Sequence, residues 1–247
     1  MQNILIIGAT SAVAQHFAQR AQVRGDKLYC VARSEEKLTG LQEALGTSLV
    51  GSRCYDFTDY ERAPRVIEEA YAALGHIDLA LFAQGLLPNQ AETETDFDQL
   101  ENAVAVNLLS VVALLNPLHI KLRAQSSPSK VAVITSVAGD RGRPRNFTYG
   151  AAKGGLGLYL QGMRSKFWRG SVELYNIKLG PTDSPMTVDH EKNGTFITAE
   201  KAAELIDRGL KKKTYDFYVP GFWRLIMLAV RLMPEWVFQR LKFLSAP

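Results

Sequence analysis

The sequence contains only two cysteines, Cys30 and Cys54, in 247 residues. Both lie within apolar, strand-like stretches. This placement favours buried, unreactive thiols over a disulfide bond, and it favours a reducing compartment. No metal site is predicted.

Long charged or apolar runs are also missing. The net charge of +4 is mild, and no basic run or aromatic–basic array accompanies it, so nucleic acid is not indicated as a partner. No stretch of about 18 uncharged apolar residues occurs, so no segment is expected to span a bilayer. No basic segment precedes the first apolar run, so no signal peptide is expected. We therefore expect a cytoplasmic protein.

The residues that are present suit one large α/β domain, with 47% hydrophobic and 22% charged residues. Strand-like and helical segments alternate from residue 3 to residue 220, which predicts a Rossmann-type, doubly wound parallel sheet of seven strands. No repeat or linker divides this stretch. We expect residues 1–220 to form one domain and residues 221–247 an amphipathic helical tail. The strands are expected at residues 4–7, 28–32, 49–55, 77–82, 131–135, 172–178 and 217–219.

The first predicted strand ends in a glycine turn at Gly8, and a helix follows directly. A helix N-terminus in this position can hold pyrophosphate through its free N–H groups and its dipole. Ala12 and Ala14 stand where dinucleotide-binding turns usually have glycine. Ala14 still permits close packing of helix on strand, whereas Ala12 is the weaker match. An ordinary strand–helix turn remains the alternative.

The second predicted strand ends at Arg33 rather than at an acidic residue. An acid at this place binds the ribose hydroxyls of NAD, whereas a basic residue suits the 2′-phosphate of NADP. The position therefore favours NADP(H) over NAD(H). The alternative is a solvated arginine at the start of the next helix.

Tyr149 and Lys153 are four residues apart in a predicted helix and share one face. A neighbouring ammonium group favours the ionised form of a phenol, so Tyr149 is a candidate general acid or base near neutral pH. Such a pair also arises by chance in many helices. Ser136 stands at the end of the fifth strand, where open α/β sheets bind ligands. Asn107 lies in a long apolar helix, predicted over residues 96–124 with a kink at Pro117, and needs hydrogen-bond partners.

Together these residues resemble the short-chain dehydrogenase/reductase family over about residues 3–220. The resemblance rests on the turn at Gly8, on Asp56, Asn107, Ser136 and Tyr149-x-x-x-Lys153, and on the loop from Gly180 to Ser184. The sequence departs from the family pattern in the two alanines of the turn. It also has Phe82-Ala83-Gln84-Gly85 in place of Asn-Asn-Ala-Gly, and Leu179-Gly180 in place of Pro-Gly. These departures affect cofactor contacts rather than the catalytic side chains.

The resemblance implies a role for each matching residue. Tyr149 would exchange a proton with the substrate oxygen, Ser136 would orient that oxygen, and Lys153 would bind the nicotinamide ribose and lower the pKa of Tyr149. Asn107 would complete a water-mediated proton relay, although a purely structural role is also open. The implied cofactor-binding residues are Gly8, Thr10, Ser11, Ala12, Val13, Arg33, Asp56, Phe57, Ala83, Gly85, Tyr149, Lys153, Gly180, Thr182 and Ser184.

The reaction implied is the NADP(H)-dependent reduction of a ketone to a secondary alcohol, or the reverse. A non-catalytic dinucleotide sensor and a sugar-nucleotide epimerase are the alternatives. The sensor is disfavoured because Ser136, Tyr149 and Lys153 are all present. A homodimer or homotetramer is expected through the helices at residues 96–124 and 147–168. The loop after Gly180 is expected to lead into a mobile substrate flap.

The tail combines apolar and aromatic residues with Arg224 and Arg231, which are seven apart and share a helical face. Pro234 suits the first turn of a second short helix. This pattern is typical of a peripheral membrane contact, and packing against a subunit or the parent domain is the alternative.

The turn after Gly8, residues 135–143 and the tail are similar to reductases paired with polyprenyl-phosphoryl-pentose oxidases. That resemblance implies a lipid-phosphate-linked 2-keto sugar as substrate. Its phosphate would lie near Arg141, Arg143 and Arg145, unless these arginines form a solvated loop.

Overall fold

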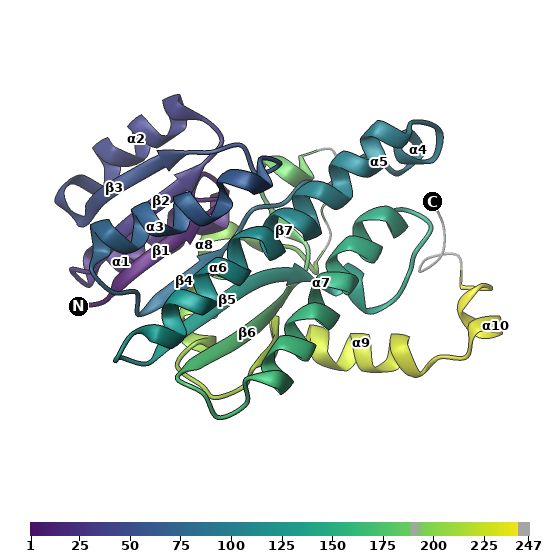
Figure 1. Cartoon of the computed structure of the whole chain (residues 1–247). Coiled ribbons are helices and arrows are strands. Elements are labelled where there is room, and N and C mark those ends of the chain that lie inside the picture. The colour runs from purple at the N-terminus through teal and green to yellow at the C-terminus, as the bar shows by residue number, and fades with distance from the viewer. Residues whose placement is uncertain (189–191, 193, 242–247) are drawn as a thin grey trace.

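The computed structural model describes residues 1–188, 192 and 194–241. A seven-stranded parallel sheet in the order β3-β2-β1-β4-β5-β6-β9 forms its centre, as predicted (Figure 1). The strands are β1 (Asn3–Ile7), β2 (Lys27–Ala32), β3 (Leu49–Cys54), β4 (Leu79–Phe82), β5 (Ser129–Ser136), β6 (Val172–Leu179) and β9 (Asp216–Val219).

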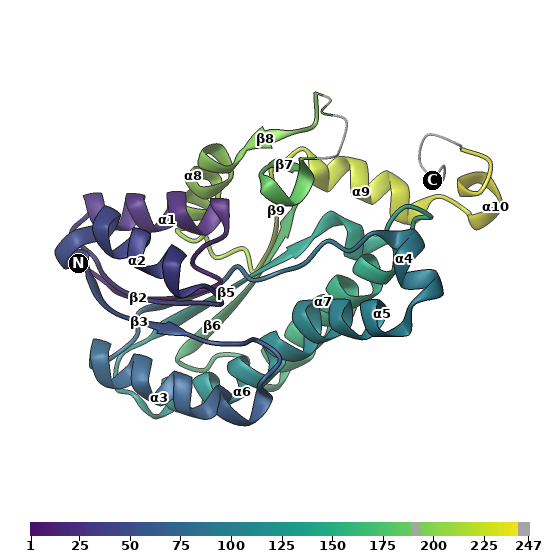
Figure 2. The same ribbon diagram turned by 90° about the horizontal axis from the view of Figure 1, so that it is seen from above.

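Helices cover both faces of the sheet, and each face has its own apolar core. Seen from above, one layer lies on each side of the sheet (Figure 2). The first layer is α1 (Ala12–Val23), α2 (Glu35–Leu45) and α8 (Ala199–Gly209), and the second is α3 (Ala63–Leu74), α6 (Ser110–Ala124) and α7 (Phe147–Lys166).

The order of the strands reverses between β1 and β4. Both strands are buried along their whole length, and they pair in parallel from Ile4–Leu79 to Ile7–Phe82. Apolar side chains on both faces explain why these stretches read as continuous hydrophobic runs. In open α/β sheets the crevice at such a reversal, beyond the carboxyl ends of the strands, is where ligands bind.

The long helix predicted over residues 96–124 is instead built from three pieces. These are α5 (Phe97–Val104), a π-helical turn at Ala105–Leu109, and α6. The irregularity lies at Asn107, whereas Pro117 sits inside α6 without interrupting it. Contrary to the expectation from the sequence, Phe97–Ala124 is long and apolar enough to cross a membrane by length and composition, and it is the one such segment within the described residues. Its most apolar stretch is 56% buried, and α6 packs against α3, so it is a core helix.

Smaller elements complete the fold and include several that the sequence did not predict. A two-stranded sheet pairs β7 (Thr182–Asp183) with β8 (Ile197–Thr198), and α4 (Gln90–Thr95) precedes α5. Of the predicted flap, residues 189–191 and 193 lie outside the described part of the chain. Short 3₁₀ turns occupy Gly46–Ser48, Tyr60–Arg62, Val137–Asp140 and Pro185–Thr187.

The expectation for the cysteines is half wrong. Cys30 lies in the core, whereas Cys54, at the end of β3, is exposed. Strand β3 lies at the edge of the sheet, where alternate side chains face solvent, so the Cys54 thiol is not covered.

The tail forms α9 (Trp223–Leu232) and α10 (Glu235–Phe238), and Pro234 caps the second helix. Trp223, Met227 and Val230 on one face of α9 pack with Val137, beside the end of β5. One face of the tail therefore belongs to the parent domain. Residues 242–247 lie outside the described part of the chain.

Candidate active site

The turn after β1 packs directly against the chain that follows β4. Gly8 has φ +79°, and its N–H donates to the Val31 carbonyl at 2.9 Å. A β-carbon at Gly8 would lie 2.3 Å from the backbone nitrogen of Gln84. Only glycine combines this backbone conformation with so close an approach. Gly8 thus lets two strand ends meet at the crevice.

The N-terminus of α1 faces this crevice and carries no acidic residue in its first turn. The Ser11 hydroxyl caps the helix by accepting from the Ala14 N–H at 3.3 Å. Ala14 is fully buried, as close helix–strand packing requires. Ala12 and Ser184 line one cavity of about 660 Å³, so the methyl group of Ala12 does not close it. No carboxylate in the first turn of α1 therefore offsets the positive end of the helix dipole, and an anion can bind at this N-terminus.

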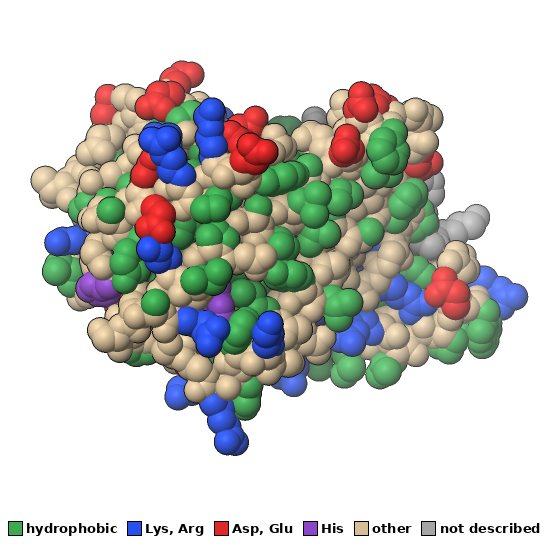
Figure 3. Space-filling model, viewed as in Figure 1, with side chains coloured by type: hydrophobic (Ala, Val, Ile, Leu, Met, Phe, Trp, Pro, Cys, Tyr) green, Lys and Arg blue, Asp and Glu red, His purple; other side chains and the backbone are tan. Residues whose placement is uncertain are grey.

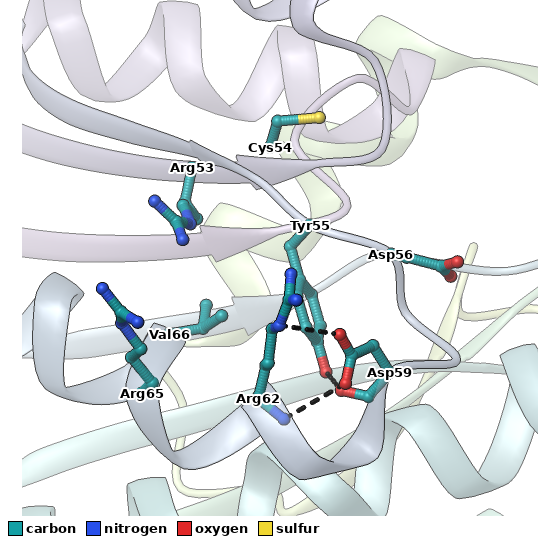
Figure 4. A pocket seen from close by; sticks show the side chains of 8 residues that line it. All are labelled: Arg53, Cys54, Tyr55, Asp56, Asp59, Arg62, Arg65 and Val66. Carbon is teal, nitrogen blue, oxygen red and sulfur yellow. Dashed lines mark hydrogen bonds and ion pairs between the residues drawn. The ribbon is translucent and has the colours of Figure 1, made fainter.

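Arg33 and Asp56 follow β2 and β3 on the same edge of the sheet, and both are exposed. Asp56 accepts from the N–H and the hydroxyl of Thr58, at 2.9 and 2.8 Å. These bonds, with a smaller contribution from Arg33, lower the pKa of Asp56. In Figure 4 the Asp56 carboxylate points away from the Asp59–Arg62 pair. Phe57, a predicted cofactor residue, instead has its side chain in the core.

Asn107 is fully buried and joins the π-helical turn to the chain after β4. Its amide donates to the carbonyls of Leu86 and Ala103, at 2.7 and 2.9 Å, and its oxygen accepts from the Leu86 N–H at 3.1 Å. The side chain satisfies backbone groups at a π-turn, a kind of irregularity frequent at functional sites.

Lys153 extends from α7 into the same region and is 3% exposed. Its ammonium group donates to the carbonyls of Ile134 and Gln84, at 3.3 and 3.5 Å. Gly85 lies between Lys153 and Asn107: a β-carbon there would be 3.5 Å from Lys153 Nζ and 3.3 Å from Asn107 Oδ1. Burial lowers the pKa of Lys153 to about 8.

Tyr149 stands one helical turn before Lys153, whose Nζ is 5.9 Å from the centre of the phenol ring. Burial raises the pKa of Tyr149 to about 12, and the nearby Ser136 hydroxyl acts in the opposite direction. Lys153 does not contribute the expected lowering of this pKa, and desolvation sets its direction. Ser136 itself ends β5 and accepts from the Ala138 N–H at 3.1 Å.

The loop after β6 closes the other side of the crevice. The Gly180 N–H donates to the Val219 carbonyl at 2.8 Å, and Thr182 is buried, with its hydroxyl bonded to the Gly180 carbonyl. Ser184 starts the 3₁₀ turn that follows, in a capping box with Thr187.

The sequence did not predict three features of the site. A β-carbon at Gly180 would lie 2.2 Å from the indole nitrogen of Trp223, so the tail covers this loop. Gln84 is 5% exposed, and within the described residues neither its amide oxygen nor its nitrogen has a hydrogen-bond partner. Asp140 is bound by Lys178 and by the Tyr218 hydroxyl, which fixes the loop after Ser136. A single tryptophan, glutamine or aspartate carries no spacing signal that points to such contacts.

The geometry agrees with comparisons to known proteins. Residues 2–194 match the family model for short chain dehydrogenase. An uncharacterised oxidoreductase from the mprA 5′ region of Streptomyces coelicolor is 31% identical over 252 residues, covering 97% of this chain and 96% of the relative. An uncharacterised oxidoreductase of Mycobacterium tuberculosis is 29% identical and covers 96% of each chain.

Solved structures share the fold at low identity. A short chain dehydrogenase from Burkholderia cenocepacia in complex with NADP has a TM-score of 0.78 at 19% identity, covering 94% of this chain and 98% of its own. One from Mycobacterium paratuberculosis bound to NAD has a TM-score of 0.77 at 15% identity, covering 88% of this chain and 95% of its own. The family match, the relatives and the crevice agree, and the chain belongs to the short-chain dehydrogenase/reductase family of oxidoreductases.

Proposed function

We propose that this oxidoreductase is an NADP(H)-dependent carbonyl reductase, in which Tyr149 delivers the proton to a ketone oxygen. One observation carries the proposal. The Ser136 hydroxyl lies close enough to Tyr149 to lower the pKa of its phenol, the phenol ring lies beside the buried ammonium group of Lys153, and Gly85 lies between that group and Asn107. Hydroxyl, phenol and ammonium groups thus meet at the carboxyl ends of β4 and β5.

Each of the four site residues has a role that follows from its chemistry. Ser136 and Tyr149 donate hydrogen bonds to the substrate oxygen as negative charge grows on it. Tyr149, with its pKa of about 12, is protonated at neutral pH and can serve as the acid. Lys153, with its pKa of about 8, still carries a charge there and stabilises the phenolate left behind. Asn107 holds the chain after β4 beside Lys153, where a water can link the site to solvent.

The cofactor site fits a dinucleotide. The close approach at Gly8 and the acid-free first turn of α1 suit pyrophosphate, and the cavity lined by Ala12 and Ser184 leaves space beside them. When bound, NADP(H) supplies the hydride. Arg33, exposed at the end of β2, would hold the 2′-phosphate and so sets the preference for NADP(H) over NAD(H).

The test is NADPH oxidation by the purified protein across keto-sugar, keto-acyl and steroid panels. Tyr149→Phe removes only the hydroxyl group, so it should reduce turnover by about three orders of magnitude or more while NADPH still binds. Phe147→Tyr, at an exposed position of α7 two residues before Tyr149, is the matched control and should retain activity. Full turnover by Tyr149→Phe would remove Tyr149 from this role.

The substrate class is a narrower part of the proposal. The resemblance to reductases of lipid-phosphate-linked keto sugars supports such a substrate, but Arg141 is already engaged: it donates to the carbonyls of Val230 and Met233, at 2.5 and 2.6 Å. Arg143 contacts the Met227 sulfur at 3.2 Å. These arginines hold the tail, so the solvated loop considered from the sequence does not describe them. Turnover of simple ketones without turnover of polyprenyl-phosphoryl keto sugar would exclude this substrate.

The proposed homo-oligomer would use α6 and α7. Both helices expose apolar side chains to solvent, and Ile120 and Leu158 are 69% and 70% exposed. Sedimentation of Leu158→Glu beside the unmodified protein tests this contact, and an unchanged sedimentation coefficient would argue against it.

A further inference from the structure

Helix α9 has two apolar faces, and only one of them is covered. Trp223, Met227 and Val230 point into the protein and are at most 7% exposed. The residues spaced for the opposite face are Leu225, Leu228, Ala229 and Leu232, at i, i+3, i+4 and i+7. Its three leucines are 71%, 52% and 74% exposed. A surface helix of an ordinary soluble domain carries polar residues in these positions.

This outer face continues along the tail. We name it the tail surface: Phe222, Leu225, Ile226, Leu228, Leu232 and Trp236. These are six of the 19 exposed large hydrophobic residues in the described part of the chain, gathered within 15 positions. In Figure 3 hydrophobic and basic side chains gather together over α9 and α10, at the lower right. So dense a patch is typical of an interaction site rather than of scattered surface residues.

The charges beside the tail surface are predominantly positive. Residues 221–247 contain four basic residues and a single acid, Glu235. Glu235 is paired with Arg141. Arg224 and Arg231, one full heptad apart at the edge of the leucine face, are exposed and form no ion pair with any described residue. Arg240 lies 5.5 Å from the ring of the exposed Trp236. The tail surface therefore combines exposed apolar side chains with arginines whose positive charge is not offset by a described acid.

We propose that the tail surface binds the interface of a lipid bilayer that contains anionic headgroups. The leucines and Trp236 enter the boundary between headgroups and acyl chains, and Arg224, Arg231 and Arg240 contact the phosphates. Arginine suits this place because its apolar stem lies along the helix while its charge reaches the headgroups. Tryptophan is favoured at the same depth.

A second copy of the chain fits this surface less well. A symmetric contact between two antiparallel α9 helices, centred between Met227 and Leu228, places Arg224 of one copy against Arg231 of the other. No acid of α9 is available to offset that repulsion, because the helix contains none. An anionic membrane supplies the missing negative charge, whereas a second copy adds more positive charge.

The attachment also sets the orientation of the molecule. The inner face of α9 packs on Val137, the residue after Ser136, and Trp223 covers Gly180. A bilayer on the outer face of α9 therefore lies on the side where β5 and β6 end, which is the side of the proposed active site. Membrane binding itself does not depend on the proposed reaction.

The experiment is co-sedimentation of the full chain with two kinds of vesicle, one of phosphatidylcholine alone and one of phosphatidylcholine and phosphatidylglycerol in equal amounts. The expected result is binding to the mixed vesicles that weakens as salt rises. Arg224→Gln/Arg231→Gln should weaken it by about fivefold per arginine, and Leu225→Ser/Leu232→Ser by roughly tenfold or more. Lys212→Gln/Lys213→Gln and Val23→Ser, at exposed positions elsewhere, are the matched controls and should bind as the unmodified chain does.

Circular dichroism and sedimentation velocity show whether the same variants remain folded and keep their oligomeric state. The tail variants should retain the helical spectrum and melting temperature of the unmodified chain. If the chain does not bind mixed vesicles, or if the folded tail variants bind them as tightly as the controls, the proposal is wrong. If the leucine variant instead dissociates an oligomer without changing lipid binding, a second copy covers the tail surface.

Discussion

The ammonium nitrogen of Lys153 lies 5.9 Å from the centre of the Tyr149 ring. Burial shifts the pKa of each group in the direction that favours its neutral form. The pKa of Tyr149 rises to about 12 and that of Lys153 falls to about 8. Over the physiological range the lysine is therefore the member of the pair whose charge changes.

We predict that the rate of ketone reduction falls as pH rises through about 8. Below its pKa Lys153 is charged and stabilises the developing phenolate, and above its pKa this support is lost. Well above pH 8 the rate should fall about tenfold per pH unit. Initial rates at saturating NADPH between pH 6 and pH 10 measure this profile. Lys153→Gln should be slower and should lose the inflection; a profile that keeps it would assign the pKa to another group.

Arg33 is predicted to set the choice of cofactor. Charge-assisted hydrogen bonds contribute about 1.5–3 kcal/mol, so Arg33→Gln should weaken NADPH binding by roughly 10- to 100-fold. NADH lacks the 2′-phosphate, and its affinity should change little. Isothermal titration calorimetry with both nucleotides measures the difference. Arg62→Gln is the matched control, because Arg62 is a nearby arginine paired with Asp59. Equal losses for the two nucleotides would refute the assignment.

Asn107 is predicted to contribute to stability as well as to activity. Asn107→Ala leaves two carbonyls and one N–H without their partner in a buried position. Such groups cost about 1–3 kcal/mol, which for a domain of this size lowers the melting temperature by roughly 5 °C. Thermal unfolding by circular dichroism measures the shift. Asn116→Ala on α6 removes one exposed hydrogen bond with Tyr159 and should shift it far less.

The sheet could be predicted because its strands are buried on both faces. Ile4 to Ile7 reads as one apolar run, and the same holds for β4, so hydrophobicity alone marked the strand positions. Helical spacing also predicted that Lys153 lies beside Tyr149, and its ammonium nitrogen is 5.9 Å from the centre of the phenol ring. The place of Ser136 beside this pair was implied only by the resemblance to the family, because no local pattern links the end of β5 to α7.

Other features depend on contacts between distant segments. The π-helical turn at Asn107 arises because its amide satisfies the backbone of Leu86, 21 residues earlier, and periodicity does not report such a bond. Pro117 was expected to kink the helix on local grounds; it lies inside the continuous helix α6, and the change of helix type lies at Asn107 instead. The pKa of Tyr149 was expected to fall because charge spacing is visible in a sequence, whereas the burial that raises it is not.

The remaining prediction concerns the bond between Arg141 and the tail. The Arg141 guanidinium donates to the carbonyls of Val230 and Met233 at the end of α9, pairs with Glu235 at 2.6 Å and lies 4.0 Å from the centre of the Phe238 ring. Arg141→Gln cannot replace these contacts, so α9 and α10 should open more often. Hydrogen exchange at residues 223–238 should accelerate by about 10- to 100-fold, while exchange in β1 and β4 stays unchanged.

The control is Arg208→Gln, which removes an exposed arginine that pairs with Glu204 within α8. It should leave exchange in the tail unaltered. Because the inner face of α9 packs beside Ser136, loosening by Arg141→Gln should also raise KM more than it lowers kcat. Unchanged exchange at residues 223–238 would show that the apolar contacts of Trp223 and Met227 alone hold the tail on the domain.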